Sequence, residues 1–163
     1  MPSRLPQRIE FAVHTSANPQ LCWEVFTDWE NWNSFLPGVY KKIEWTKGEP
    51  WALGSRVHMQ MLQPVEFNTE CVIIGSSPPN KIGWIHHEMQ NMVEQWVSFL
   101  PDGESGSNIS IWLEINGRTL QILGRDVVEV VREFKQEWYR RLAQRCDKLT
   151  LERKDRRQAA IEL

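Results

Sequence analysis

Residues 126–149 read DVVEVVREFKQEWYRRLAQRCDKL, and their apolar pattern is the strongest structural signal in the chain. Its apolar side chains recur at steps of three and four, which is the spacing of one continuous helical face about six turns long. That face consists of Val127, Val131, Phe134, Trp138, Leu142, Cys146 and Leu149. Asp126 and Glu129 have the spacing of a capping box, with Asp in place of Ser or Thr, so the helix is predicted to begin there. A helix with one long apolar face requires a broad apolar surface to cover it.

The middle of the chain supplies such a surface, because its apolar period changes from helical spacing to two. Alternating runs are predicted to form strands over residues 39–45, 55–63, 65–74, 82–88, 92–100 and 109–115, and an earlier strand over 8–16. Turn clusters rich in Gly, Pro, Ser and Asn separate several of these runs. Strands joined by short turns pair antiparallel, so we expect a mainly antiparallel sheet.

Two short helices are predicted directly after the first strand. Asn18 and Pro19 have the residue types of a helix cap and of a first helical position, and residues 29–36 form a second short helix that ends at Pro37. The order predicts an α+β architecture, a curved antiparallel sheet of about six to seven strands around a long C-terminal helix. The domain is expected over residues 7–151, followed by a charged tail, 152–163, that frays or projects into solvent.

Composition excludes several classes of protein. The 163 residues are 41% hydrophobic and 25% charged with a net charge of −2, which excludes disorder and a membrane span and argues against a nucleic-acid binder. Cys22, Cys71 and Cys146 lie far apart without a C-x-x-C motif, so buried thiols are expected rather than disulfides or a zinc site. The first residues hold no apolar signal segment, which favours a cytoplasmic protein. No metal or cofactor is expected.

A twisted sheet wrapped around one helix closes poorly along the groove, so a cavity between them is predicted. Its walls are expected to come from both elements: Val57, Met59, Met61, Phe67, Trp84 and Trp96 of the sheet, with Phe134 and Trp138 of the helix. The nine tryptophans allow an alternative outcome, in which large rings fill the space. The sequence leaves both open.

Histidines and carboxylates in the strands are the weak candidates for acid–base chemistry. They are His58, His86, Glu88 and Glu94. His86 and His87 are adjacent in a strand, so they point to opposite faces and cannot share one metal ion. Alternation alone does not tell which of these side chains faces inward. Surface or satisfied-core positions are the competing interpretation for each.

Several segments together resemble the START-like superfamily called SRPBCC, which has the helix-grip fold of the birch pollen allergen. They are residues 17–26 (ANPQLCWEVF), 29–32 (WENW), 35–39 (FLPGV), 81–84 (KIGW) and 100–103 (LPDG), with the C-terminal helix. Within the superfamily the chain looks most like small bacterial proteins of the polyketide cyclase/dehydrase and lipid transport type. The resemblance implies a cavity for a hydrophobic ligand. It supplies no universal catalytic motif, so no catalytic residue carries over.

The expected function is therefore binding of a hydrophobic or aromatic small molecule, lipid or polyketide-like, between the C-terminal helix and the sheet. One alternative is a polyketide cyclase/dehydrase-type enzyme that uses a His/Glu acid–base pair in the same cavity. Another is a protein-interaction module that uses the charged tail and exposed tryptophans. The expected partner is a hydrophobic small molecule, without nucleic acid or membrane insertion, and the chain is expected to be a monomer or homodimer.

Overall fold

The fold is built on a single curved sheet. The computed structural model describes residues 6–88, 91–117, 121–122 and 124–162. Seven antiparallel strands follow the order β1-β7-β6-β5-β4-β3-β2, so the first strand pairs with the last. Their bounds are β1 Gln7–Thr15, β2 Tyr40–Lys47, β3 Arg56–Met61, β4 Phe67–Ser77, β5 Lys81–Glu88, β6 Asn91–Asp102 and β7 Gly106–Gly117. The predicted antiparallel sheet is confirmed.

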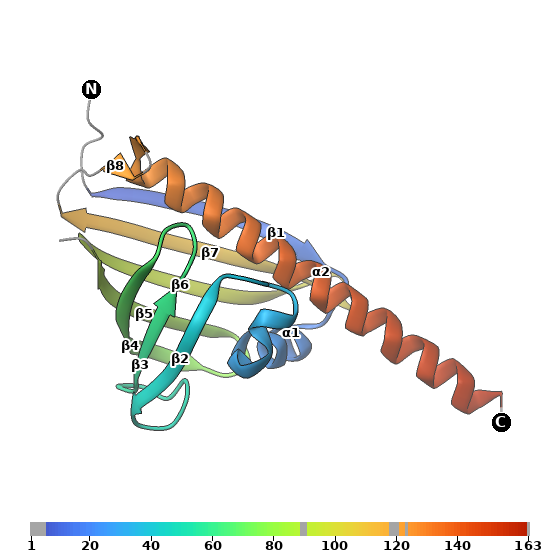
Figure 1. Cartoon of the computed structure of the whole chain (residues 1–163). Helices are drawn as coiled ribbons and strands as arrows, with labels where there is room; N and C mark the ends of the chain where they lie inside the picture. The colour runs from blue at the N-terminus through green and yellow to red at the C-terminus, as the bar shows by residue number, and fades with distance from the viewer. Residues whose placement is uncertain (1–5, 89–90, 118–120, 123, 163) are drawn as a thin grey trace.

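Two short helical segments follow β1, as the sequence predicts. Helix α1, Pro19–Thr27, begins where the Asn18 side chain accepts a hydrogen bond from the Leu21 backbone N–H at 2.9 Å, with Pro19 in the first turn. The 3-10 helix η1, Trp29–Ser34, comes next. Both lie at one end of the curved sheet, beside the middle of the long helix (Figure 1).

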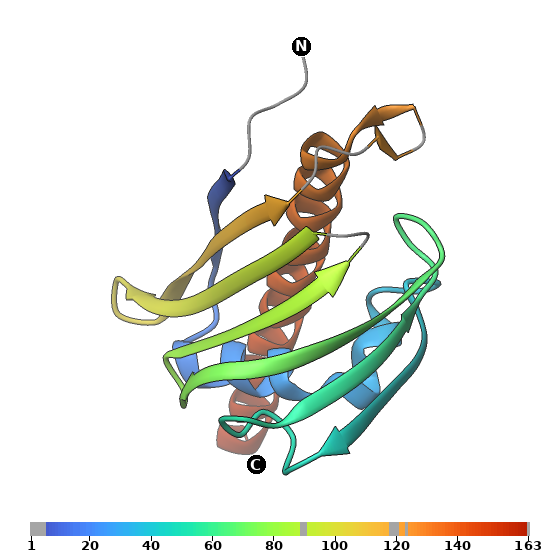
Figure 2. The ribbon, with the colours of Figure 1, turned by 90° about the vertical axis from the view of Figure 1, so that its left-hand side faces the viewer.

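The long helix α2, Val127–Ile161, crosses the inner face of the sheet and packs against β1 and α1. Asp126 caps it by accepting a hydrogen bond from the Val128 backbone N–H at 2.8 Å. Viewed from its N-terminal side, the sheet curls around the helix, with β1 and β7 close to it and β2 and β3 farther away (Figure 2). A two-stranded ladder, β8 Gln121–Ile122 with β9 Arg125–Asp126, precedes α2 and was not predicted. The helix-grip architecture is confirmed.

The apolar interior is divided into two clusters of buried side chains. The larger cluster joins α1, η1 and the middle of α2 to the sheet and includes Phe26, Trp32 and Trp138. The smaller cluster lies under the first turns of α2 and consists of Ile9, Val93, Leu113, Ile115, Val127, Val128 and Val130.

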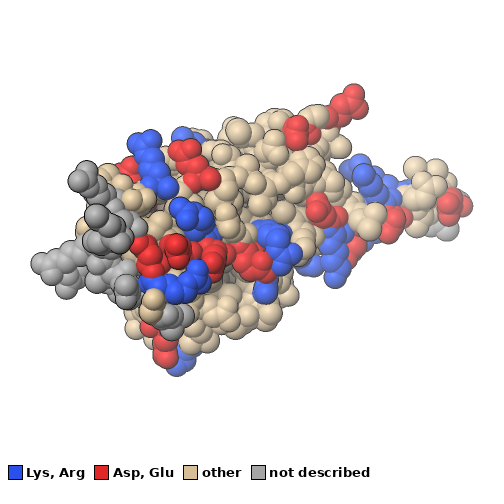
Figure 3. Space-filling model, turned by 90° about the horizontal axis from the view of Figure 1, so that it is seen from above, with Lys and Arg blue, Asp and Glu red and all other residues tan. Residues whose placement is uncertain are grey.

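The last turns of α2 extend past the sheet. Residues 152–161, which belong to the expected charged tail, continue the helix and project from the body of the molecule (Figure 1). Side chains of both signs alternate along the solvent side of α2 (Figure 3). Arg125 pairs with Glu133 at 2.7 Å, and Glu137 pairs with Arg141 at 2.8 Å. This side of the helix therefore carries mixed charge.

Candidate functional site

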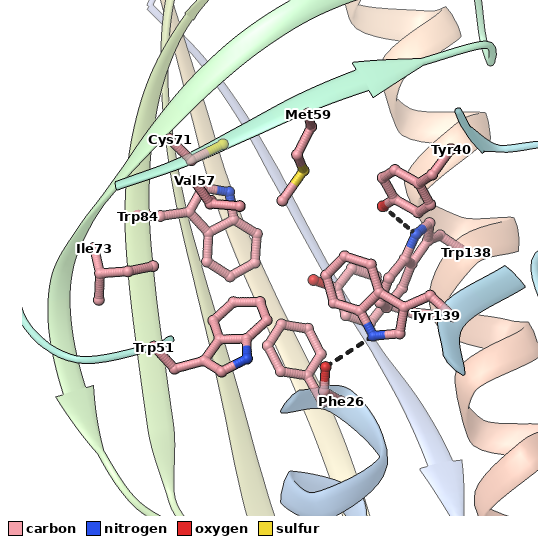
Figure 4. Close-up of a pocket in the computed structure, with 11 residues that line it drawn as sticks. Phe26, Tyr40, Trp51, Val57, Met59, Cys71, Ile73, Trp84, Trp138 and Tyr139 are labelled. Carbon is pink, nitrogen blue, oxygen red and sulfur yellow. Dashed lines mark hydrogen bonds between the residues drawn. The ribbon is translucent and has the colours of Figure 1, made fainter. Parts of the chain in front are cut away.

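A small cavity lies between the inner face of the sheet and α2 (Figure 4). Its volume is about 40 Å³, and it is lined by Phe26, Trp32, Tyr40, Trp51, Val57, Met59, Cys71, Ile73, Trp84, Trp138 and Tyr139. This is close to the space of one water molecule, about 30 Å³, and far below the roughly 300–1,000 Å³ of ordinary ligand pockets. At about 24 cal/mol per Å³ it costs the fold only about 1 kcal/mol.

Aromatic rings fill most of the space around this cavity. The ring centre of Phe26 lies 5.3–6.0 Å from those of Trp32, Trp51, Trp84, Phe99 and Trp138. Two indoles are fixed by hydrogen bonds, because Trp32 Nε1 donates to the Phe26 carbonyl at 2.9 Å and Trp51 Nε1 to the Thr27 carbonyl at 2.8 Å. Next to α1, large aromatic rings therefore fill most of the space between the sheet and α2.

Some apolar side chains of the inner face and of α2 are only partly covered. Met59, Trp84 and Phe67 belong to the inward-facing sets of β3, β5 and β4, yet each is only half-buried. Phe134, one turn before Trp138 on α2, is also half-buried although it packs against the larger core cluster. These apolar side chains face the interior but stay partly in contact with solvent. We call these four residues the mouth.

Polar groups stand among the rings. Tyr40 Oη accepts a hydrogen bond from Trp138 Nε1 at 2.9 Å, and Tyr139 Oη accepts one from Gln95 Nε2 at 2.5 Å. Burial is the main cause that raises the pKa of both phenols well above the usual value. Both tyrosines are therefore neutral throughout the physiological pH range.

The inner wall of the sheet carries further buried polar side chains beside the mouth. Thr69, His86 and Gln95 are 5%, 7% and 0% exposed, and all three face inward. Thr69 Oγ1 and Gln95 Oε1 have no hydrogen-bond partner among the described residues. Buried polar atoms of this kind are uncommon in folded proteins, and they supply orienting contacts when a ligand reaches them.

Four of the eight predicted wall residues line the cavity itself: Val57, Met59, Trp84 and Trp138. Met61 and Phe67 face the same interior from the far end of the β3–β4 pair, where they are opposite each other in the ladder. Phe134 stands on α2 at the mouth. These seven side chains are therefore inside the grip of the sheet.

Trp96 is a correction, because it lies on the outer face of the sheet. Its neighbours Gln95 and Val97 are fully buried, and strand alternation turns Trp96 the other way. Its indole rests on two glycines, since a Cβ atom built on either Gly75 or Gly83 would come within 2.4 Å of the ring. Lys81 Nζ lies 4.6 Å from its ring centre on the solvent side. The indole thus covers a strip of sheet that has no side chains of its own.

The four acid–base candidates are not brought together. His58 follows the outward parity of β3, and Glu94 shares the outer face with Trp96. His86 alone faces the interior among the candidates whose side chains are described. Glu88 ends β5, and its side chain lies outside the described part of the chain. In the described part no three His, Cys, Asp or Glu side chains are grouped so that they could hold a metal ion.

Several lining residues were not expected from the sequence. Trp51 comes from the loop between β2 and β3 and enters the interior with a positive φ of 67°, for which no periodic signal exists. Phe26 lies on the buried side of α1, but its central position depends on how α1 docks. Tyr139 follows Trp138 directly and is three residues before Leu142, so a wider apolar arc on α2 would have included it.

The amino-acid sequence also matches the model of a known protein family. The model of the family described as polyketide cyclase/dehydrase and lipid transport matches residues 6–149. The chain belongs to this family. No curated protein matches the chain by sequence. Membership in this family agrees with the resemblance noted from the sequence. None of the described helices is long and apolar enough to cross a membrane.

Solved structures show the same architecture. A START superfamily protein from Mycobacterium smegmatis is similar with a TM-score of 0.71 and 15% identity, over 87% of this chain and 98% of that chain. A hypothetical protein from Helicobacter pylori has a TM-score of 0.70 and 10% identity, over 86% and 88%. Norcoclaurine synthase from Thalictrum flavum in complex with dopamine and hydroxybenzaldehyde has a TM-score of 0.64 and 16% identity, over 91% and 88%. At these identities the likeness establishes the shared fold.

Proposed function

We propose that the chain binds a hydrophobic or aromatic small molecule, lipid or polyketide-like, at the mouth between α2 and the sheet. The observation that carries this proposal is the half-burial of inward-facing apolar side chains, Met59 and Trp84 on the sheet and Phe134 on the helix. A ligand that covered about 200 Å² of such apolar surface would gain about 5 kcal/mol before association costs.

The small cavity determines how such a ligand enters. Because the cavity has a volume of about 40 Å³, only one group of the ligand fits inside without movement of side chains. Met59 is unbranched and adaptable, so its displacement opens space at low cost. The remainder of the ligand would then lie across the mouth, against Phe67 and Phe134. The family description includes lipid transport, and a solved relative holds two aromatic molecules, which supports an apolar or aromatic ligand.

Binding is favoured over acid–base catalysis in this cavity. A His/Glu pair requires both groups on one wall, within about 3 Å of a reacting atom. His86 faces inward, whereas His58 and Glu94 lie on the outer face of the sheet. The described inner wall therefore offers one histidine and no carboxylate partner from the candidate set.

The test uses N-phenyl-1-naphthylamine, a neutral apolar fluorophore whose emission rises in apolar sites. Saturable binding is expected in the wild type. Met59→Trp fills the mouth and should weaken binding about tenfold. His58→Trp, one residue away on the outer face, is the matched control and should leave the affinity within about twofold. Thermal melting establishes that both variants fold.

Phe134→Ala is a second variant, which removes the helical wall of the mouth and should also weaken binding. The proposal would be overturned by absence of saturable binding in the wild type. Equal affinities in wild type, Met59→Trp and Phe134→Ala would overturn it as well, because the probe would then occupy another surface.

A further inference from the structure

Two tyrosines that line the cavity indicate which class of ligand it binds, an inference that rests on the proposed function. We propose that Tyr40 and Tyr139 form a two-donor site that recognises a neutral carbonyl oxygen of the ligand. The ligand class is then an aromatic or hydrophobic ketone or aldehyde.

Each phenol oxygen already accepts one hydrogen bond. Trp138 Nε1 donates to Tyr40 Oη, and Gln95 Nε2 donates to Tyr139 Oη. A tyrosine hydroxyl also has one proton to donate, and neither proton has an acceptor among the described residues. Tyr40 is 9% exposed and Tyr139 is 1% exposed, so bulk water does not solvate them freely. Two buried donors therefore remain available to a guest.

The two hydroxyls come from different elements and line the same cavity. Tyr40 begins β2 at the sheet edge, and Tyr139 stands on α2 (Figure 4). Trp138 contacts both tyrosines. Its indole N–H donates a hydrogen bond to Tyr40 Oη, and its ring centre lies 4.8 Å from that of Tyr139. The hydrogen bonds from Trp138 and Gln95 hold both phenols in place before a ligand arrives. Preorganised donors bind an acceptor without the cost of ordering them.

The chemistry of the lining selects a neutral acceptor. All eleven lining side chains are uncharged, and nine of them are apolar or aromatic without a hydroxyl. A carboxylate placed here would lose its hydration and gain only two neutral hydrogen bonds, which is unfavourable. A carbonyl oxygen has two lone pairs and a much smaller desolvation cost. It matches two O–H donors in number, and a volume of about 40 Å³ accommodates a carbonyl group.

The experiment compares 1-indanone with indane, which has a CH₂ group where 1-indanone has the carbonyl. Both are titrated into wild-type protein, Tyr40→Phe and Tyr139→Phe, with the indole N–H resonances as the readout. Each substitution should weaken 1-indanone binding about three- to tenfold and leave indane binding within about twofold. Trp112→Phe, on the outer face of the sheet, is the matched control and should change neither affinity.

Infrared spectroscopy adds a readout that a purely structural role would not change. The carbonyl stretch of bound 1-indanone should lie at lower frequency in the wild type than in either tyrosine variant. Equal losses for both ligands in the variants, or an unchanged carbonyl stretch, would overturn the carbonyl site while leaving the proposed function intact. Failure of both indane and 1-indanone to bind the wild type would overturn the proposed function together with this inference.

Discussion

At the scale of single residues, Trp84 and Trp96 show how strand parity separates a site from a surface. They lie on neighbouring strands, and Trp96 pairs with Gly83 while Trp84 pairs with Gln95. Trp84 therefore faces the cavity, and Trp96 covers Gly75 and Gly83 on the outside. Large aromatic side chains laid over strand glycines restore packing that glycine lacks.

Trp96→Ala should therefore lower stability without affecting ligand binding. Removal of the half-buried indole that packs on Gly75 and Gly83 should lower the unfolding free energy by about 2 kcal/mol. Urea unfolding measures this loss, and titration with N-phenyl-1-naphthylamine should give the wild-type affinity. A large loss of affinity in this variant would place the probe on the outer face and contradict the account.

The two tyrosines give a prediction about alkaline pH. Burial raises the folded-state pKa of Tyr40 and Tyr139 above the unfolded value, which is near 10. Their contribution to stability is therefore complete below about pH 10 and is lost as the pH rises further. The chain contains only these two tyrosines, so all tyrosinate absorbance reports on them. It should appear together with the loss of circular dichroism.

Tyr139→Phe should move the midpoint of alkaline unfolding to higher pH, because one ionising group is removed from the interior. A tyrosinate signal that titrates near pH 10 in protein that keeps its circular dichroism would contradict the burial of these phenols.

At the scale of elements, α2 is tied to the beginning of the chain by one carboxylate. Asp147 Oδ1 accepts hydrogen bonds from Thr15 Oγ1 at 2.6 Å, the Ser16 backbone N–H at 2.8 Å and Ser16 Oγ at 3.1 Å. These bonds join α2 to the turn between β1 and α1. They fix the position of α2 relative to β1 and α1.

Asp147→Ala should lower the unfolding free energy by about 2 kcal/mol, because a charged acceptor of several hydrogen bonds is lost. Asp155→Ala, on the projecting part of the same helix, is the control and should change stability by less than about 0.5 kcal/mol. Chemical denaturation of both variants checks the difference. Equal stability of the two variants would show that the Asp147 contacts do not hold the helix.

Elements of this kind were predictable from the sequence because their signals are local. The spacing of Val127, Phe134 and Trp138 defined α2, and Asn18 with Pro19 defined the start of α1. The face of a strand residue is a different matter. His58 points outward and His86 inward, and alternation within a single strand does not say which of its two faces is the inner one. Trp96 was assigned to the wrong face for the same reason.

At the scale of the whole molecule, the curved sheet and α2 determine where an opening lies, but the volume of the interior depends on every ring that enters it. The sequence predicted a curved sheet around a long helix, and it left open whether aromatic rings would fill the space between them. Trp51 from a loop and Phe26 from α1 reduce the enclosed cavity to about 40 Å³. Such closure depends on how separate elements dock, and no local pattern encodes it.

The projecting end of α2 gives a prediction at this scale. Arg153 and Glu24, 3.4 Å apart and both exposed, link residues 152–163 to the body, and such ion pairs contribute little. Removal of residues 152–163 should change the unfolding free energy by less than about 1 kcal/mol and leave probe binding unchanged. Calorimetry and the fluorescence titration check both points. Loss of ligand binding on truncation would instead favour a role of this segment in the site.

The most direct test of the central claim is an indole N–H spectrum of the protein during titration with N-phenyl-1-naphthylamine. Nine tryptophans are distributed over both faces of the sheet and the helices, so each resonance reports a known place. The signals of Trp84 and Trp138 should shift on binding, while those of Trp96 and Trp112 should stay unchanged. Shifts confined to Trp96 and Trp112, with Trp84 and Trp138 unaffected, would contradict a ligand site between α2 and the sheet.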